Sequence, residues 1–122
     1  MILCSDDTKD RDLASDIFEN LSDHRIEVKM NLRCSEQEYH EVLQACSWFI
    51  IILSKEAKEF EVFCRGLQQV LQFCVTNNKI KMLPVLRDLL PSEVPPIISW
   101  VTLLEDNKHL QENLLAVIKG KV

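Results

Sequence analysis

The central pattern of the chain is an unbroken run of six apolar residues, from Trp48 to Leu53, between Ser47 and Ser54. A bilayer crossing needs about 20 such residues, so the run is too short to span a membrane. Its β-branched and aromatic residues favour a strand, and the lack of polar alternation indicates that both faces are covered. The run therefore predicts a central strand of a parallel sheet with helices on each side.

Strand-like and helix-like patterns alternate along the rest of the chain. Strands are predicted at 2–4, at 26–30 (where polar and apolar residues alternate, as near a sheet edge), at 80–86 and at 97–104. Apolar residues at helical spacing predict four helices, marked by Leu13, Ile17, Phe18 and Leu21; by Tyr39, Val42, Leu43 and Cys46; by Phe60, Phe63, Cys64, Leu67, Val70, Leu71 and Cys74; and by Leu110, Leu114, Val117 and Ile118. Asp7 or Thr8 is positioned to cap the first helix, and the last is expected to start near Asp106.

This alternation predicts an α/β fold. About five parallel strands with right-handed crossovers form a flavodoxin-like three-layer domain with helices on both faces. The 122 residues correspond to a single domain. Ligands and partners of such sheets gather where the strands end, which places a crevice at Ser5, Asp6, Asp7 and Ser54.

The composition of the chain argues against several classes of function. A net charge of −5 with scattered Lys and Arg argues against a nucleic-acid partner, and no run of the chain suits direct membrane insertion. Acidic residues from position 6 onwards argue against a signal peptide. Five cysteines without a C-x-x-C pair predict reduced thiols in the cytoplasm and no metal site. Only two glycines are present, so no phosphate-binding loop is expected. No bound cofactor is expected.

Three segments resemble Toll/interleukin-1 receptor (TIR) domains. They are Ile2 to Asp7, an apolar strand followed by a serine and acids; Cys46 to Ser54, with its apolar run ending in Leu-Ser; and Lys81 to Val85, with an apolar-Pro-apolar step. Together they make the chain similar to a divergent TIR domain spanning 1–122, excised from a longer protein. The resemblance implies a cytoplasmic signal-transduction module of innate-immune type.

The resemblance also implies how such a module works, which is homotypic association. The interaction loop would be Asn31, Leu32, Arg33, Cys34, Ser35 and Glu36, although it lacks the Pro-Gly turn usual in the family. Its partners would be other TIR domains, either copies of itself or an adaptor or receptor. A contact of this kind that does not close produces weak oligomers or filaments. Within the loop, Cys34 is either an ordinary exposed thiol or one activated by Arg33.

Some TIR domains cleave the nicotinamide–ribose bond of NAD, which gives an alternative function with NAD as substrate. By position the catalytic carboxylate would be Glu61, with Glu59 second, stabilising oxocarbenium-like charge. The other interpretation is that both are solvated acids favoured by a helix N-terminus. A response-regulator receiver is disfavoured, because Ser54 stands where the phosphate-accepting aspartate would be and Arg87 where a lysine would be.

Overall fold

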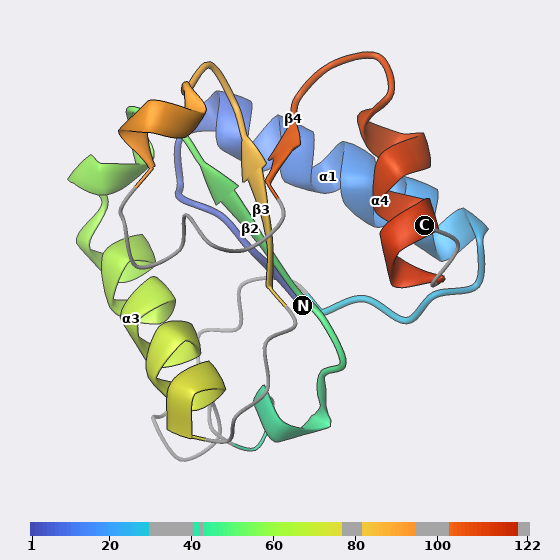
Figure 1. Ribbon diagram of the computed structural model, residues 1–122, viewed down its shortest axis with the longest axis horizontal. Coiled ribbons are helices and arrows are strands. Elements are labelled where there is room, and N and C mark those ends of the chain that lie inside the picture. Colours follow the sequence, from blue (N-terminus) through green and yellow to red (C-terminus); the bar gives the residue numbers. More distant parts are fainter. Residues whose placement is uncertain (30–40, 42, 77–81, 95–102, 120–122) are drawn as a thin grey trace.

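The structure is a computed structural model that describes residues 1–29, 41, 43–76, 82–94 and 103–119. Four strands form one parallel sheet in the order β1-β2-β3-β4 (Figure 1). Their bounds are Ile2–Leu3 for β1, Phe49–Leu53 for β2, Met82–Leu86 for β3 and Leu104–Glu105 for β4. This arrangement confirms the predicted α/β class and the parallel sheet.

Helices lie against both faces of this sheet. Helix α3 (Glu61–Thr76) covers one face, while α1 (Thr8–Asp23) and α4 (Leu110–Ile118) cover the other (Figure 1). Successive residues of β2 alternate between the two cores, with Ile51 in the cluster of α3 and Ile50 and Ile52 in the cluster of α1 and α4. All five residues of β2 are buried, which confirms the prediction of a central strand covered on both sides.

Pro84 lies in the middle of β3, a strand inside the sheet, without breaking it. Pro84 pairs in register with Ile51 of β2. The backbone nitrogen of Arg87 donates to Leu53 in β2, and the carbonyl of Leu86 accepts from Asp106 beyond β4. Since backbone groups alternate in direction along a strand, the nitrogen of Pro84 faces the β4 side. Its missing N–H therefore removes no bond to β2.

Helix α1 forms as the sequence predicts, but one residue assigned to its buried face is exposed. The Asp7 carboxylate accepts hydrogen bonds from the backbone nitrogens of Lys9 and Asp10, so Asp7 is the N-cap. The buried stripe runs through Leu13, Ala14, Ile17 and Leu21. Phe18 was expected to be part of it but is 37% exposed, because it lies 100° further round the helix than Ile17.

The strand predicted at 26–30 is not formed in its described part, residues 26–29. Ile26 and Val28 are half-buried between exposed polar neighbours, so the predicted alternation of burial is present. The nitrogen of Ile2 donates to the carbonyl of Lys29 at 2.8 Å. The described residues thus form four strands where about five were expected.

The remaining predicted elements are described only in part. Residues 43–45 of the predicted second helix are helical, with Leu43 buried; Tyr39 and Val42 lie outside the described residues. Of the strand predicted at 97–104, only the end is described, and Leu104 begins β4. Helix α4 begins at Leu110 rather than near Asp106, because Asp106 to Lys108 form a turn in which the Asn107 side chain accepts from the His109 nitrogen.

Candidate functional site

A buried aspartate joins three strand ends at the carboxyl edge of the sheet, the edge where the parallel strands end. Ser5 follows β1, Ser54 follows β2 and Arg87 follows β3. Both serine hydroxyls donate to Asp10 Oδ2 at 2.7 Å, and Arg87 Nε donates to Asp10 Oδ1 at 2.6 Å. Asp10 comes from the first turn of α1 and is fully buried. We call Ser5, Asp10, Ser54 and Arg87 the Asp10 network.

The two serines of the Asp10 network also organise the segments that follow them. Ser5 Oγ accepts from the Asp7 nitrogen at 3.2 Å, just before α1. Ser54 Oγ accepts from the Ala57 nitrogen at 3.1 Å, where the short helix η1 (Ala57–Glu59) begins. Each hydroxyl therefore both donates and accepts, so neither is left with an unmet bond. The network positions the start of α1 and of η1.

The guanidinium of Arg87 is surrounded by carboxylates. Besides Asp10, it donates to Asp7 at 3.2 Å, to Glu56 at 2.9 Å and to Asp88 at 3.3 Å. Burial lowers the pKa of Arg87, but the hydrogen bond and charge of Asp10 and the charges of Glu56 and Asp7 outweigh it and raise the pKa. Four carboxylates around one cation leave this edge with excess negative charge, which is unsuited to binding a phosphate group.

A shallow acidic hollow adjoins the network between α1 and the ends of β3 and β4. Its lining comprises Lys9, Asp12, Leu13, Asp16, Arg87, Asp88 and Asp106. Burial raises the pKa of Asp106, as do the charges of Asp88 and Asp16, while Arg87 opposes the shift. The ionised form of Asp106 is thus disfavoured in the folded protein.

Asp106 is therefore expected to cost stability at neutral pH. A carboxyl whose pKa is higher folded than unfolded contributes stability at low pH, and loses it as the pH rises from the unfolded value of 3.8 through the folded one. Asp106→Asn removes this cost and should raise the free energy of unfolding at about pH 7. The gain should be only a few tenths of a kcal/mol, because solvent screens an exposed side chain. Urea unfolding measures this. An equal gain at about pH 4 would contradict the assignment, since the penalty is absent when the carboxyl is protonated.

The predicted crevice is occupied by side chains of the protein itself. The structure brings Ser5 and Ser54 together on Asp10, and Asp7 joins them through Arg87. Asp6 is exposed next to them. The space between the strand ends thus contains a saturated ionic network.

Asp10 and Arg87 are the two site residues that the sequence prediction missed. Asp10 lies on the same helical face as Leu13, Ala14 and Ile17, so its burial could have been inferred from the spacing. Arg87 follows an apolar strand directly, as Ser54 does. Asp10 and Arg87 carry opposite charges at positions expected to be buried. Because isolated charges are rarely buried, this combination predicts that the two side chains pair.

The candidate catalytic acids lie away from this network, in the segment that leads into α3. Glu61 is the first residue of α3, is exposed, and forms an ion pair with Arg65 one turn along. The hydrogen bond and charge of Arg65 lower the pKa of Glu61. Glu59 is exposed in η1. The interaction loop, Asn31 to Glu36, lies outside the described residues.

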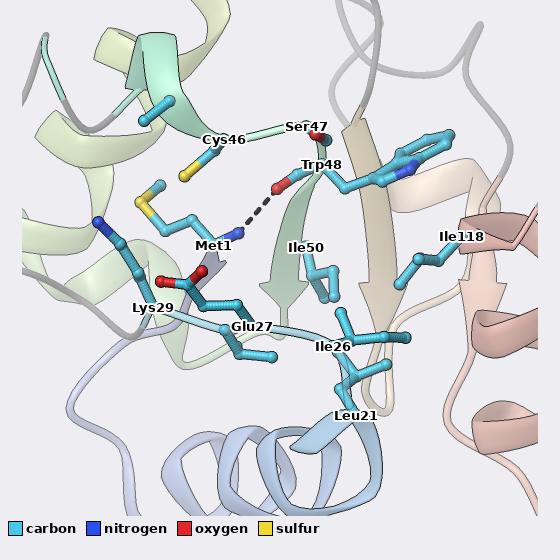
Figure 2. Close-up of a pocket in the computed structure, with 12 residues that line it drawn as sticks. Met1, Leu21, Ile26, Glu27, Lys29, Cys46, Ser47, Trp48, Ile50 and Ile118 are labelled. Atoms are coloured by element: carbon cyan, nitrogen blue, oxygen red, sulfur yellow. Dashed lines mark hydrogen bonds between the residues drawn. The ribbon is translucent and has the colours of Figure 1, made fainter. Parts of the chain in front are cut away.

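A larger cavity lies at the opposite, amino end of the sheet. It measures about 480 Å³; half of its lining residues are aliphatic, and the others are Met1, Glu27, Lys29, Cys46, Ser47 and Trp48. Figure 2 shows Trp48 and Ile118 on one side and Cys46 with Met1 on the other; the terminal amine of Met1 donates to the Trp48 carbonyl at 2.7 Å. Its volume is in the range of small-molecule sites, and Glu61 is not part of its lining.

Comparisons with known proteins leave the chain without an assigned family. No family model matches it, and no curated protein is significantly similar to it. Within the described residues, no three His, Cys, Asp or Glu side chains are grouped as metal ligands would be. The four described cysteines form no disulfide. None of the described helices is long and apolar enough to cross a membrane.

Proposed function

We propose that this chain is a TIR-like interaction module that associates with other TIR domains, copies of itself or those of a receptor or adaptor, in cytoplasmic signalling of innate-immune type. Support comes from the parallel α/β sheet and from the segments that carry the resemblance. Ile2–Leu3 and Phe49–Leu53 form paired parallel strands, and the apolar-Pro-apolar step lies in β3.

The proposal includes a flavodoxin-like sheet of five strands in three layers. The nitrogen of Ile2 bonds to Lys29, while the Ile50 nitrogen bonds to Met1 from the β2 side. A backbone partner at Lys29 suits a further strand on the free edge of β1. The second strand of the chain would then lie at the edge of the sheet, next to β1, as in the flavodoxin-like strand order.

The observation that carries the interaction function is the saturation of the carboxyl edge. Asp10 accepts three hydrogen bonds, and the buried Arg87 is bonded to four carboxylates. A residue that serves catalysis needs an atom free for a substrate. The network favours a role in holding the loops that follow β1, β2 and β3 in fixed positions, which is what a binding surface requires.

NAD cleavage is the weaker of the two proposals. Glu61 is exposed and engaged with Arg65, whereas a carboxylate that stabilises oxocarbenium-like charge acts best in a water-excluded site. Incubation of the concentrated, clustered protein with NAD tests it directly. Release of nicotinamide that disappears in Glu61→Ala would replace the interaction function with the enzymatic one.

The interaction function predicts that Leu32→Ala with Arg33→Ala weakens self-association at least about tenfold while the protein stays folded. Leu32 would supply an apolar contact and Arg33 a charge-assisted one. Sedimentation velocity over a range of concentrations measures association, and circular dichroism measures folding. Arg11→Ala, which removes an exposed cation from α1, is the matched control. Unchanged assembly in the folded double variant would exclude the loop mechanism.

A further inference from the structure

The cavity at the amino end of the sheet has two chemically different ends. Its apolar end, in the right half of Figure 2, is formed by Trp48, Ile118, Ile26 and Leu21. Trp48, Ile26 and Ile118 are half-buried and pack against the core that α1 and α4 cover. Apolar surface that such side chains leave at a cavity favours an apolar occupant, because binding removes that surface from water.

The other end of the cavity carries one cation and one carboxylate. Lys29 and Glu27 line it from the segment that follows α1, on the side of Met1 and Cys46 (Figure 2). Burial lowers the pKa of the Met1 amine, Cys46 opposes the shift and the charge of Lys29 adds to it, so the Lys29 ammonium lies within electrostatic reach of that amine. Neither Glu27 nor Lys29 forms an ion pair with another residue in the described ranges. Within this part of the chain, both charged groups are available to a ligand.

The spacing of the two charged residues suits a ligand that carries both charges itself. Residues 26–29 alternate between half-buried and exposed, so Glu27 and Lys29 project from the same side of the segment. Alternate residues of an extended chain are about 7 Å apart, which leaves room for one small head group between the two side chains. A carboxylate on that head group would meet Lys29, and an ammonium would meet Glu27. A ligand with a carboxylate alone, such as a fatty acid, would also meet the like charge of Glu27.

We propose that this cavity binds a free α-amino acid with a large apolar side chain, such as phenylalanine or leucine. The zwitterionic head group lies between Glu27 and Lys29, and the apolar side chain lies against Trp48 and Ile118. The volume of about 480 Å³ accommodates a molecule of this size. With exposed ionic contacts and a small ligand, the dissociation constant is expected to be on the order of 1 mM. The inference concerns a ligand and does not rest on the proposed interaction function.

Analogues of phenylalanine test which parts of the ligand are recognised. Titration of the full ¹⁵N-labelled chain, followed by two-dimensional NMR, gives each dissociation constant. Phenylalanine should bind at least about threefold more tightly than N-acetylphenylalanine, which lacks the ammonium, or phenylalaninamide, which lacks the carboxylate. Alanine should bind at least about tenfold more weakly, because it buries less apolar surface. Equal binding of either single-charge analogue, or no binding of phenylalanine up to about 20 mM, overturns the proposal.

Neutral variants of the two charged residues assign the head group. Lys29→Gln should weaken phenylalanine binding at least about threefold and leave phenylalaninamide unchanged, because that amide has no carboxylate for Lys29 to contact. Glu27→Gln should weaken phenylalanine in the same way and leave N-acetylphenylalanine unchanged. Lys108→Gln, at an exposed position outside the cavity lining, is the matched control and should change none of these constants by more than about twofold. If Lys29→Gln weakens phenylalanine and phenylalaninamide equally, the head-group assignment is wrong.

Alkylation of Cys46 locates the bound ligand. Cys46 lines the cavity and is half-buried, whereas Cys64 is half-buried outside the lining and serves as the internal control. Saturating phenylalanine should slow the alkylation of Cys46 by iodoacetamide at least about threefold and leave Cys64 unchanged, as mass spectrometry of the two peptides measures. An unchanged rate at Cys46 places the ligand elsewhere and overturns the proposal. A chain that self-associates but binds no phenylalanine overturns this inference alone, whereas one that binds phenylalanine here and associates with no TIR domain overturns only the interaction function.

Discussion

Arg87→Met is expected to lower the free energy of unfolding by about 3–5 kcal/mol, the cost of removing one partner from a buried ion pair. The substitution leaves Asp10 fully buried with only the two serine hydroxyls as partners. It also leaves Asp7 and Glu56 close together without the cation between them. Single domains are stable by about 5–15 kcal/mol, so this loss is a large fraction of the total. Urea unfolding followed by circular dichroism measures it.

Two further variants distinguish the lost pair from a general packing defect. Arg87→Met combined with Asp10→Asn removes both charges and should be more stable than Arg87→Met alone, because no buried charge remains. Asp88→Asn removes a partner that is 82% exposed and should cost less than about 1 kcal/mol. If the double variant is less stable than Arg87→Met, or if Asp88→Asn costs as much as Arg87→Met, the buried pair is not the source of the loss.

Phe49→Ala is expected to lower the free energy of unfolding by about 3–5 kcal/mol, because it opens a cavity in the core beneath α3. Phe49 is 2% exposed, and its ring meets that of Phe73 edge to face with centroids 6.0 Å apart. The contact joins the central strand β2 to helix α3. Chemical denaturation gives the loss, and Phe49→Leu, which keeps most of the volume, should cost about 1.5 kcal/mol.

The aromatic contact itself is measured by a double-mutant cycle. Phe49→Ala with Phe73→Ala should be less destabilised than the sum of the two single variants by about 0.5–1.5 kcal/mol. Strictly additive losses would show that the two rings contribute only through the surface they bury.

The elements predicted best are those whose patterns are long and unmixed. The run that ends in Leu53 allowed only a strand covered on both faces, and the stripe from Phe60 to Cys74 allowed only an amphipathic helix. Phe18 was wrongly assigned to the buried face of α1, because the apolar spacing of this helix does not show which residues at the edge of the apolar stripe face the core. Residues 26–29, the described part of the predicted strand 26–30, show alternation of burial, yet pairing along an edge depends on a partner strand, which the pattern of this segment does not specify.

The Asp10 network was harder to predict than the strands that carry it. Ser5, Asp7 and Ser54 were placed at the carboxyl edge by the order of the elements, and the structure has them there. Asp10 and Arg87 are 77 positions apart, and their pairing is fixed only when α1 and β3 meet. Sequence spacing reveals neighbours on one helix or strand, whereas this contact depends on the tertiary arrangement of two elements.

Pro84 has a consequence for how the acidic hollow is assembled. Its nitrogen faces β4 without a hydrogen to donate, and the β3–β4 pairing starts at the next residue, with Val85 opposite Leu104. A slide of β4 by two residues towards the start of β3 would require the donor that proline lacks. Pro84 therefore disfavours this shifted register of β4. Together with the hydrogen bond from the Asp106 nitrogen to the Leu86 carbonyl, the missing donor of Pro84 favours the register in which Asp106 lies level with the end of β3.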